Sequence, residues 1–160
     1  MTSIYLDSNI LIAYYSAHRS EQSKKHMVHN SLDVFAEARD VSLCTSIWAV
    51  TEMVNVLISA QKMNPATVEE IESRLHTESF GSLRLRVLTV SPREGYDFLS
   101  FFEDVRIQIL KYHPGVGDAI HSVIMKNHGI DHILTFDESD FAQIPGLTVF
   151  NPRNFKVKTQ

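Results

Sequence analysis

Apolar residues along the chain form short runs that alternate with longer stretches of helical spacing. Runs typical of buried strands occupy residues 3–6, 41–45, 132–136 and 147–150, and residues 84–90 alternate basic and apolar side chains. Helical stretches are predicted at 9–17, about 21–38, 47–62, from 65 onward, 92–111 and 118–128. Because strands that alternate with helices form parallel sheets covered on both faces, the pattern predicts an α/β fold.

Polar residues stand where several of these helices are expected to begin. Ser8 or Asn9 can cap the first helix, and Ser46 can cap the apolar helix that follows the second strand. Asn64 followed by Pro65 is typical of a helix start, because proline suits the first turn. The chain has no repeat, linker or low-complexity tract, so we expect one domain.

Four carboxylates occupy positions at which α/β folds often bind ligands or catalyse reactions. Asp7 and Asp137 directly follow predicted strands, and Asp118 opens a predicted helix after a loop at 113–117. In open parallel sheets, ligands bind beyond the carboxyl ends of the strands. Glu52 lies among apolar neighbours in a mostly buried helix, where an unpaired charge is costly. Each also has a purely structural interpretation: helix caps for Asp7 and Asp118, a turn for Asp137 and Asp140, and a solvent-facing position for Glu52.

Several carboxylates at one sheet edge would repel one another and raise each other's pKa. A hard divalent cation removes that repulsion, and Mg²⁺ and Mn²⁺ prefer oxygen ligands. Such a cation suits phosphodiester chemistry, since it makes water more acidic and offsets developing negative charge. The pattern therefore favours a metal-dependent reaction on a phosphate ester.

Four stretches of the chain form a recognisable set: IYLDSNILI, TSIWAVTEMVNVL, GDAIHSVIMKNHGIDHILTFDESDF and LTVFNP. The third stretch is the most specific, with an acid before a helix, a glycine after it, and then strand-Thr-x-Asp-x-x-Asp-Phe. Together the stretches resemble the PIN domain, the nuclease fold of VapC-like toxins and related RNA-cutting proteins. They occur in the family's order and span nearly the whole chain, whereas residues 65–111 give no motif-level match.

The resemblance implies a mostly parallel five-stranded sheet flanked by helices, which we place at residues 1–151, followed by a short basic tail at 152–160. It also implies an Mg²⁺- or Mn²⁺-dependent endoribonuclease that leaves a 5′-phosphate and a 3′-hydroxyl. As the toxin of a toxin–antitoxin pair, the chain would have RNA as substrate, a small antitoxin as partner and a homodimeric state. Carried over by position, the catalytic and metal-binding acids are Asp7, Glu52, Asp118 and Asp137, with Asp140 as a further metal contact through water and Asn9 and Thr135 as supporting residues.

Charge and composition narrow the picture further. The net charge of −4 gives no strongly basic footprint, so nucleic-acid binding cannot be argued from bulk charge. Arg84 and Arg86 share one face of a strand and the tail RNFKVK is basic, but no residue is assigned to RNA binding. A single cysteine, Cys44, agrees with a reducing cytoplasm. We expect no membrane span, because no apolar run is long enough. We expect no signal peptide either, because no positively charged region precedes the first apolar run and Asp7 interrupts it.

Two other functions and one other kind of site are open. A haloacid-dehalogenase-like phosphohydrolase also has an aspartate after its first strand, but it needs a second aspartate where this chain has Asn9. A PIN-like RNA-processing or interaction protein would have no toxin role, and a PIN-like domain used only for interaction would not be an enzyme. The eight histidines include His121, one turn from Asp118, and His113 in the preceding loop. Without an HExxH motif or Cys/His pairing, we expect the histidines at the surface or in packing roles rather than at zinc.

Overall fold

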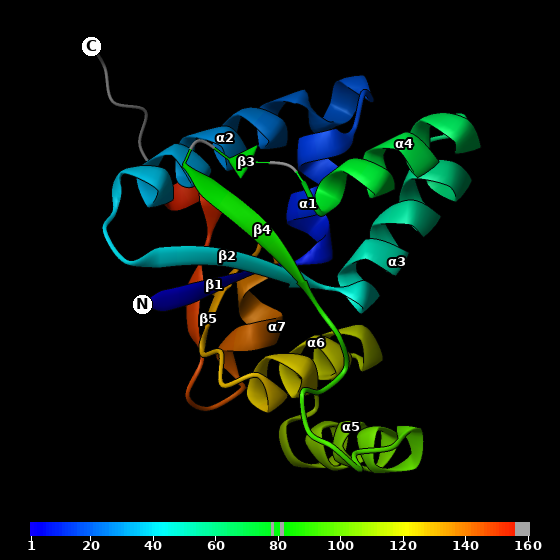
Figure 1. Ribbon diagram of the computed structural model, residues 1–160, viewed down its shortest axis with the longest axis vertical. Helices are drawn as coiled ribbons and strands as arrows, with labels where there is room; N and C mark the ends of the chain where they lie inside the picture. Colours follow the sequence, from blue (N-terminus) through cyan, green and yellow to red (C-terminus); the bar gives the residue numbers. More distant parts are fainter. Residues whose placement is uncertain (78, 81, 156–160) are drawn as a thin grey trace.

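A six-stranded sheet forms the centre of the molecule in the computed structural model, which describes residues 1–77, 79–80 and 82–155 (Figure 1). Its strand order is β3-β4-β2-β1-β5-β6, and every pair is parallel except the antiparallel pair β3–β4. The α/β fold with a mostly parallel sheet is therefore confirmed. The strands are β1 (Thr2–Leu6), β2 (Val41–Ser46), β3 (Ser79–Phe80), β4 (Leu83–Leu88), β5 (His132–Leu134) and β6 (Thr148–Phe150).

Helices cover both faces of this sheet. In Figure 1, α1, α2, α3 and α4 lie above the sheet, and α5 and α6 lie below it. The α-helices are α1 (Ser8–Tyr15), α2 (Gln22–Glu37), α3 (Ile47–Asn55), α4 (Pro65–Leu75), α5 (Phe98–Tyr112), α6 (Val116–Asn127) and α7 (Glu138–Ala142). Shorter turns are the 3₁₀ segments η1 (Arg19–Glu21) and η3 (Pro152–Asn154) and the π-helical segment η2 (Val56–Ala60), which continues α3.

The two faces of the sheet have separate hydrophobic cores, because side chains alternate along each strand. On β1, Ile4 and Leu6 pack against the helices α1 to α4, whereas Tyr5 packs toward α5 and α6. On β4, Leu85 is buried and Arg84 and Arg86 are exposed, as the alternation at 84–90 predicts. Both cores therefore hold β1 in place, and its carboxyl end is a rigid position for a functional side chain.

Several element boundaries differ from the sequence prediction. The sheet has six strands rather than five, because the two-residue strand β3 is too short to leave a pattern. The helix predicted to start at Pro92 begins at Phe98, after the cap at Asp97 and a turn in which Gly95 has a φ of +76°. The helix predicted from Asp118 begins two residues earlier at Val116, inside the predicted loop.

The first helix is capped by Asp7 and not by Ser8 or Asn9, since the Asp7 carboxylate accepts the backbone N–H of Ser8. The caps at Ser46 and Asn64 are confirmed by hydrogen bonds from the N–H groups two or three residues later. The helix predicted over 47–62 is α-helical only to Asn55 and then widens into η2.

The end of the described chain packs back onto the domain. The ring of Phe155 lies 5.3 Å from that of Phe35 on α2 and 6.4 Å from that of Phe150 on β6. The predicted tail at 152–160 lies partly outside the described residues, from 156 onward, so the boundary at 151 stays a prediction. In the part of the chain that the structure describes, no helix combines the length and hydrophobicity that crossing a bilayer requires.

Candidate metal centre

Asp7 is buried at the junction of β1 and α1, with 3% of its surface exposed. Its backbone N–H donates to the Leu134 carbonyl (3.2 Å), which ties the end of β1 to the end of β5. Its carboxylate accepts the Ser8 N–H at 2.6 Å and the Thr135 hydroxyl at 2.6 Å. Burial raises the pKa of Asp7, and the charge of His121 with these hydrogen bonds offsets only part of that effect. Asp7 thus serves as a helix cap and is also a buried carboxylate whose ionised form is disfavoured.

Asn9 connects Asp7 to the acid that follows β5. Its Nδ2 lies 2.8 Å from Asp7 Oδ2, 3.0 Å from Asp137 Oδ2 and 3.0 Å from Thr135 Oγ1. Its Oδ1 accepts the backbone N–H of Phe136 at 3.2 Å, and Thr135 Oγ1 accepts that of Asp137 at 3.0 Å. The structure therefore places both expected supporting residues, Asn9 and Thr135, between Asp7 and Asp137.

Glu52 reaches the same region from the second turn of α3. Its side chain is 29% exposed, and its Oε2 lies 2.8 Å from His121 Nε2. Partial burial opposes ionisation, but the hydrogen bond and charge of His121 outweigh it and hold the pKa of Glu52 below its usual value. The carboxylate also lies against Gly117, where an added Cβ would stand 3.1 Å from Glu52 Oε1.

Asp118 lies in the first turn of α6, whose N-cap is Gly115 rather than Asp118 itself. Burial, followed by the charges of Asp7 and Asp140, raises the pKa of Asp118 to about 6, although His121 partly opposes the shift. A Cβ on Gly115 would lie 3.0 Å from Asp118 Oδ2, so the glycine leaves room for the carboxylate. Asp140 is exposed on α7, and its contact with a metal through water stays a prediction.

His121 is the site residue that the sequence analysis missed. It was expected at the surface or in a packing role, yet it is 2% exposed and its Nε2 lies 2.8 Å from Glu52 and 3.3 Å from Asp7 Oδ1. Burial lowers its pKa, but the hydrogen bond to Glu52 and the charges of Asp7, Glu52 and Asp118 raise it above the usual value overall. The available signal was the three-residue spacing from Asp118, which puts both side chains on one face of a helix.

The donor set and the space around it fit a divalent cation. Asp7, Glu52 and His121 each offer one ligand atom, and these three atoms lie within 4.8 Å of one another. Asp118 and Asp137 stand beside this group and add further oxygens, the ligands that Mg²⁺ and Mn²⁺ prefer. Gly115 and Gly117 leave room for two of the carboxylates, as just described, and burial with mutual repulsion makes an added positive charge favourable. The roles of the individual acids as ligands stay predictions.

Two cations lie over the ring of Phe136, the residue before Asp137. The guanidinium of Arg153 lies 5.1 Å from the centre of the Phe136 ring and donates to the Phe136 carbonyl at 3.1 Å. Lys24 Nζ lies 5.9 Å from the same ring centre and 3.3 Å from Glu21. We call Lys24 and Arg153 the basic pair.

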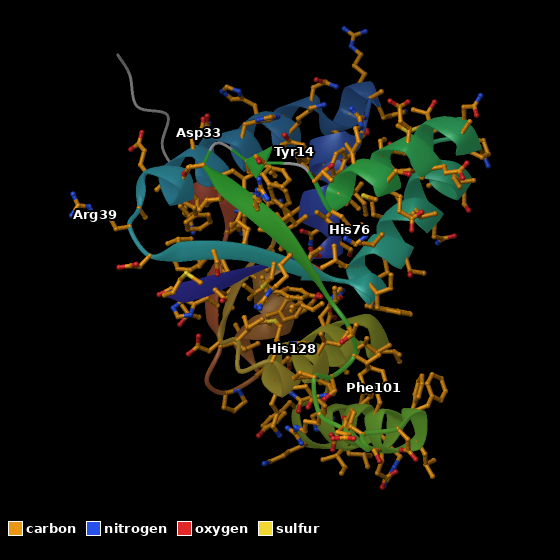
Figure 2. All side chains as sticks on the ribbon, viewed as in Figure 1. Tyr14, Asp33, Arg39, His76, Phe101 and His128 are labelled. Carbon is orange, nitrogen blue, oxygen red and sulfur yellow. The ribbon has the colours of Figure 1, made fainter. Side chains whose placement is uncertain are left out.

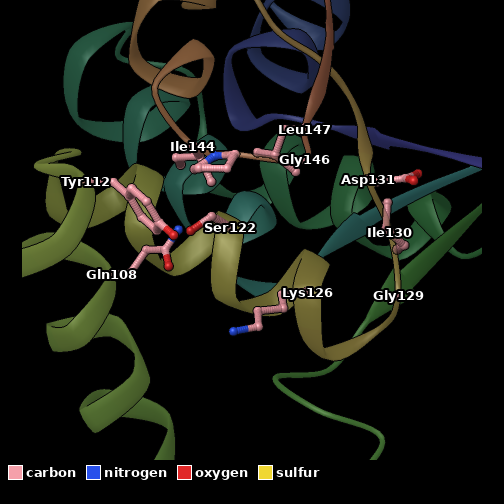
Figure 3. Close-up of a pocket in the computed structure, with 11 residues that line it drawn as sticks. Gln108, Tyr112, Ser122, Lys126, Gly129, Ile130, Asp131, Ile144, Gly146 and Leu147 are labelled. Atoms are coloured by element: carbon pink, nitrogen blue, oxygen red, sulfur yellow. The ribbon is translucent and has the colours of Figure 1, made fainter.

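A separate pocket of about 390 Å³ lies elsewhere on the molecule (Figure 3). Its lining comes from α5, from α6, from residues 129–131 before β5 and from residues 144–147 after α7. None of the four predicted acids contributes to it. Asp131 in this lining precedes β5, whereas Thr135 and Asp137 follow that strand. The pocket is therefore at the opposite end of β5 from the candidate metal centre.

Solved structures similar to this chain include proteins of toxin–antitoxin systems. A chain from VapBC2 of Rickettsia felis bound to promoter DNA superposes with a TM-score of 0.65 at 13% identity, covering 94% of this chain and 98% of that one. VapC20 of Mycobacterium tuberculosis, a toxin that cleaves the sarcin–ricin loop, superposes with a TM-score of 0.59 at 14% identity, covering 87% of this chain and 93% of that one. A chain from DNA-bound VapBC of Salmonella typhimurium superposes with a TM-score of 0.62 at 16% identity, covering 95% of this chain and 99% of that one.

At these identities the likeness establishes a shared fold. No curated protein sequence matches the chain at a significant level. The family model of the PIN domain, in contrast, matches residues 4–147, which include Asp7, Glu52, Asp118 and Asp137. The match covers most of the sequence and agrees with the resemblance found in its motifs. The chain belongs to the PIN domain family.

Proposed function

We propose that the chain is an Mg²⁺- or Mn²⁺-dependent endoribonuclease and the toxin of a toxin–antitoxin pair. The observation that carries the proposal is the convergence of Asp7 with Glu52, Asp118 and Asp137 beyond the carboxyl ends of β1 and β5. Membership of the PIN family supports nuclease chemistry, and VapC20, a similar structure, is a toxin that cleaves the sarcin–ricin loop.

The protein's own residues supply binding and orientation. A divalent cation, when bound, makes water more acidic and offsets negative charge on a phosphodiester. Asp7, Glu52, Asp118 and Asp137 would hold it, while Asn9 keeps the carboxylates of Asp7 and Asp137 turned toward each other. Without the cation, the four acids would repel the RNA backbone, so the proposal requires metal for substrate approach as well as for cleavage.

The basic pair gives the RNA backbone a place to bind beside these acids. Arg153 and Lys24 lie on Phe136, one residue before Asp137, whereas Arg84 and Arg86 lie on β4 with β2 between that strand and β1. Arginine and lysine that contact phosphates increase affinity in a salt-dependent way. The basic pair is therefore our choice for the phosphate contacts.

A small antitoxin and a second copy of the chain are the partners that we propose with this function. Similar structures include toxin–antitoxin complexes, and α5 displays apolar side chains to solvent. Phe98 and Leu99 are 76% and 77% exposed, which is unusual for large apolar residues on a helix that also packs on a core. A cytoplasmic location agrees with the buried free thiol of Cys44 and stays a prediction.

The test is cleavage of a panel of tRNA, rRNA and mRNA by purified protein with Mg²⁺ or Mn²⁺. Asp7→Asn should reduce cleavage to background while the far-ultraviolet circular dichroism stays unchanged. Asp33→Asn, an exposed position on α2 (Figure 2), is the matched control and should cleave like the wild type. Full cleavage by Asp7→Asn would refute the assignment of the site.

The two rival functions give different results in the same assay. A PIN-like domain used only for interaction would bind RNA or protein without metal-dependent cutting by the wild type. Asn9 argues against a haloacid-dehalogenase-like phosphohydrolase, because the position of the second aspartate is occupied by an amide that donates to Asp7 and Asp137. Covalent capture of a phosphoryl mimic on Asp7 would reverse that conclusion.

A further inference from the structure

The buried ring of His121 is held from both sides. Its Nδ1 lies 2.8 Å from the hydroxyl of Tyr5, which is fully buried on β1. That hydroxyl is also 2.6 Å from Ser46 Oγ, the N-cap of α3. On the other side, His121 Nε2 faces Glu52 Oε2 at 2.8 Å and Asp7 Oδ1 at 3.3 Å. Tyr5 thus fixes the ring that contacts both carboxylates.

Glu52 depends on this ring more than Asp7 does. Asp7 accepts hydrogen bonds from Ser8, Asn9 and Thr135 in addition to its longer contact with His121. For Glu52, His121 is the main partner: Oε2 lies on the imidazole and Oε1 against Gly117, while the side chains of Ser8 and Trp48 influence the carboxylate less than His121 does. Because its side chain is 29% exposed and has several rotatable bonds, loss of the imidazole would let the carboxylate turn toward solvent.

His121 as a direct metal ligand is a different possibility, since its Nε2 belongs to the group of atoms within 4.8 Å. That nitrogen already makes the 2.8 Å contact with Glu52, so a bound ion would have to replace this hydrogen bond. Both ring nitrogens have partners, Tyr5 and Glu52, which is the arrangement of a residue that orients a ligand.

We propose that His121 is a positioning residue that, anchored by Tyr5, holds the Glu52 carboxylate beside Asp7 so that both face one cation. The inference rests on the proposed function and deepens it. Hydrogen-bond partners of metal-binding carboxylates are worth about 10- to 100-fold in metal affinity. We therefore expect His121→Ala to weaken Mn²⁺ binding by that factor, through Glu52.

The experiment is calorimetric titration of Mn²⁺ into the metal-free, full-length chain at one fixed pH. The proteins are the wild type, His121→Ala, Glu52→Gln and the double variant, which form a double-mutant cycle. His121→Ala should lose affinity about 10- to 100-fold in the wild-type background but less than about threefold in the Glu52→Gln background. Equal losses in both backgrounds would overturn the inference, because His121 would then act independently of Glu52.

Two further variants keep the test valid if His121→Ala folds poorly. His121→Gln retains an amide that can donate to Glu52 and should recover at least part of the affinity. Tyr5→Phe keeps the packed ring, removes only the hydroxyl that anchors His121, and should produce a smaller loss than His121→Ala. Selective loss of Zn²⁺ rather than Mn²⁺ affinity, without recovery in His121→Gln, would identify His121 as a direct ligand and overturn the positioning role.

Asp7→Asn separates failure of this inference from failure of the proposed function. If the wild type binds Mn²⁺, Asp7→Asn loses it and His121→Ala binds as tightly as the wild type, only the role of His121 is wrong. If the wild type itself binds no Mn²⁺, or Asp7→Asn binds it unchanged, the proposed metal centre is wrong and the inference falls with it.

Discussion

The negative charge of Asp118 lowers the free energy of unfolding of the metal-free protein. Replacing Asp118 with an uncharged residue should therefore stabilise the protein. Its pKa is raised from 3.8 to about 6, chiefly by burial and then by the neighbouring acids. The folded protein therefore binds the Asp118 proton more tightly than the unfolded chain does. Above about pH 6 the carboxylate is charged in both states and the fold is penalised. Below about pH 4 it is protonated in both states and the penalty disappears.

The size of the penalty follows from the shift. A difference of about 2 pH units corresponds to about 3 kcal/mol, at about 1.4 kcal/mol per unit. Because Asp118 is only half-buried, solvent screening reduces this to about 1.5 kcal/mol. Asp118→Asn has nearly the same size and no charge, so at about pH 8 without metal it should be more stable than the wild type by about 1.5 kcal/mol. For a domain of this length, that corresponds to roughly 3–6 °C in Tm.

Urea unfolding of the chelator-treated proteins, followed by circular dichroism, measures this difference. The advantage of Asp118→Asn should shrink as the pH falls from about 6 to about 4. Saturating Mn²⁺ should reverse the order, since ligand at 100 times its Kd stabilises the wild type by about 2.7 kcal/mol and the variant binds it less well. Asp33→Asn, which removes an exposed charge, should show neither effect.

A metal-free Asp118→Asn protein that is less stable than the wild type at about pH 8 would contradict the destabilising effect of the Asp118 charge. A difference in stability between the two proteins that is the same at about pH 8 and about pH 4 would contradict it as well, because a cost of ionisation must disappear when the carboxylate is protonated.

Three further predictions concern the surroundings of the acids. Gly117→Ala should weaken Mn²⁺ binding in calorimetry, because the added methyl group would lie 3.1 Å from Glu52 Oε1 and press on that carboxylate. Thr135→Val removes the hydroxyl that donates to Asp7 and should cost about 1.5–3 kcal/mol in urea unfolding at about pH 8. That loss should diminish at low pH, where Asp7 is protonated in the folded protein. Arg153→Ala should weaken RNA binding and reduce the slope of log affinity against log salt by about 1.

Each of these has its own contradicting result. Unchanged Mn²⁺ affinity in Gly117→Ala would mean that Glu52 has room to move without loss of the site. A stability loss in Thr135→Val that is independent of pH would show that the hydroxyl does not act through the charge of Asp7. Arg39→Ala is the control for Arg153→Ala, because Arg39 lies at the turn before β2, at the amino ends of the strands (Figure 2). If Arg153→Ala and Arg39→Ala have the same slope of log RNA affinity against log salt, Arg153 does not contact the RNA phosphates more than Arg39 does.

The general architecture could be predicted because strands and helices differ in the period of their apolar residues. Asp7 and Asp137 were found in the sequence since each directly follows an apolar run, and parallel strands bring such positions to one edge. Glu52 was found because a carboxylate among apolar neighbours needs a partner. These inferences depend only on local pattern and on the geometry of parallel sheets.

The remaining features depend on contacts between distant segments. Nothing in the local sequence distinguishes His121 from other histidines in helices. Its role depends on Tyr5 of β1, which contacts one ring nitrogen, and on Glu52 of α3, which contacts the other. The start of α5 was predicted too early because Pro92 is a common first helical residue, yet Gly95 turns the chain before Asp97 caps the helix. A single sequence does not show which of these local signals the tertiary structure uses.

We propose that the acids at the carboxyl ends of β1 and β5 bind one divalent cation. Anomalous diffraction from crystals soaked in Mn²⁺ would locate that cation. We expect a peak about 2.0–2.3 Å from a carboxylate oxygen of Asp7 and of at least one acid among Glu52, Asp118 and Asp137. Clear density for these side chains with no peak among them, at Mn²⁺ concentrations that support RNA cleavage, would contradict this proposal.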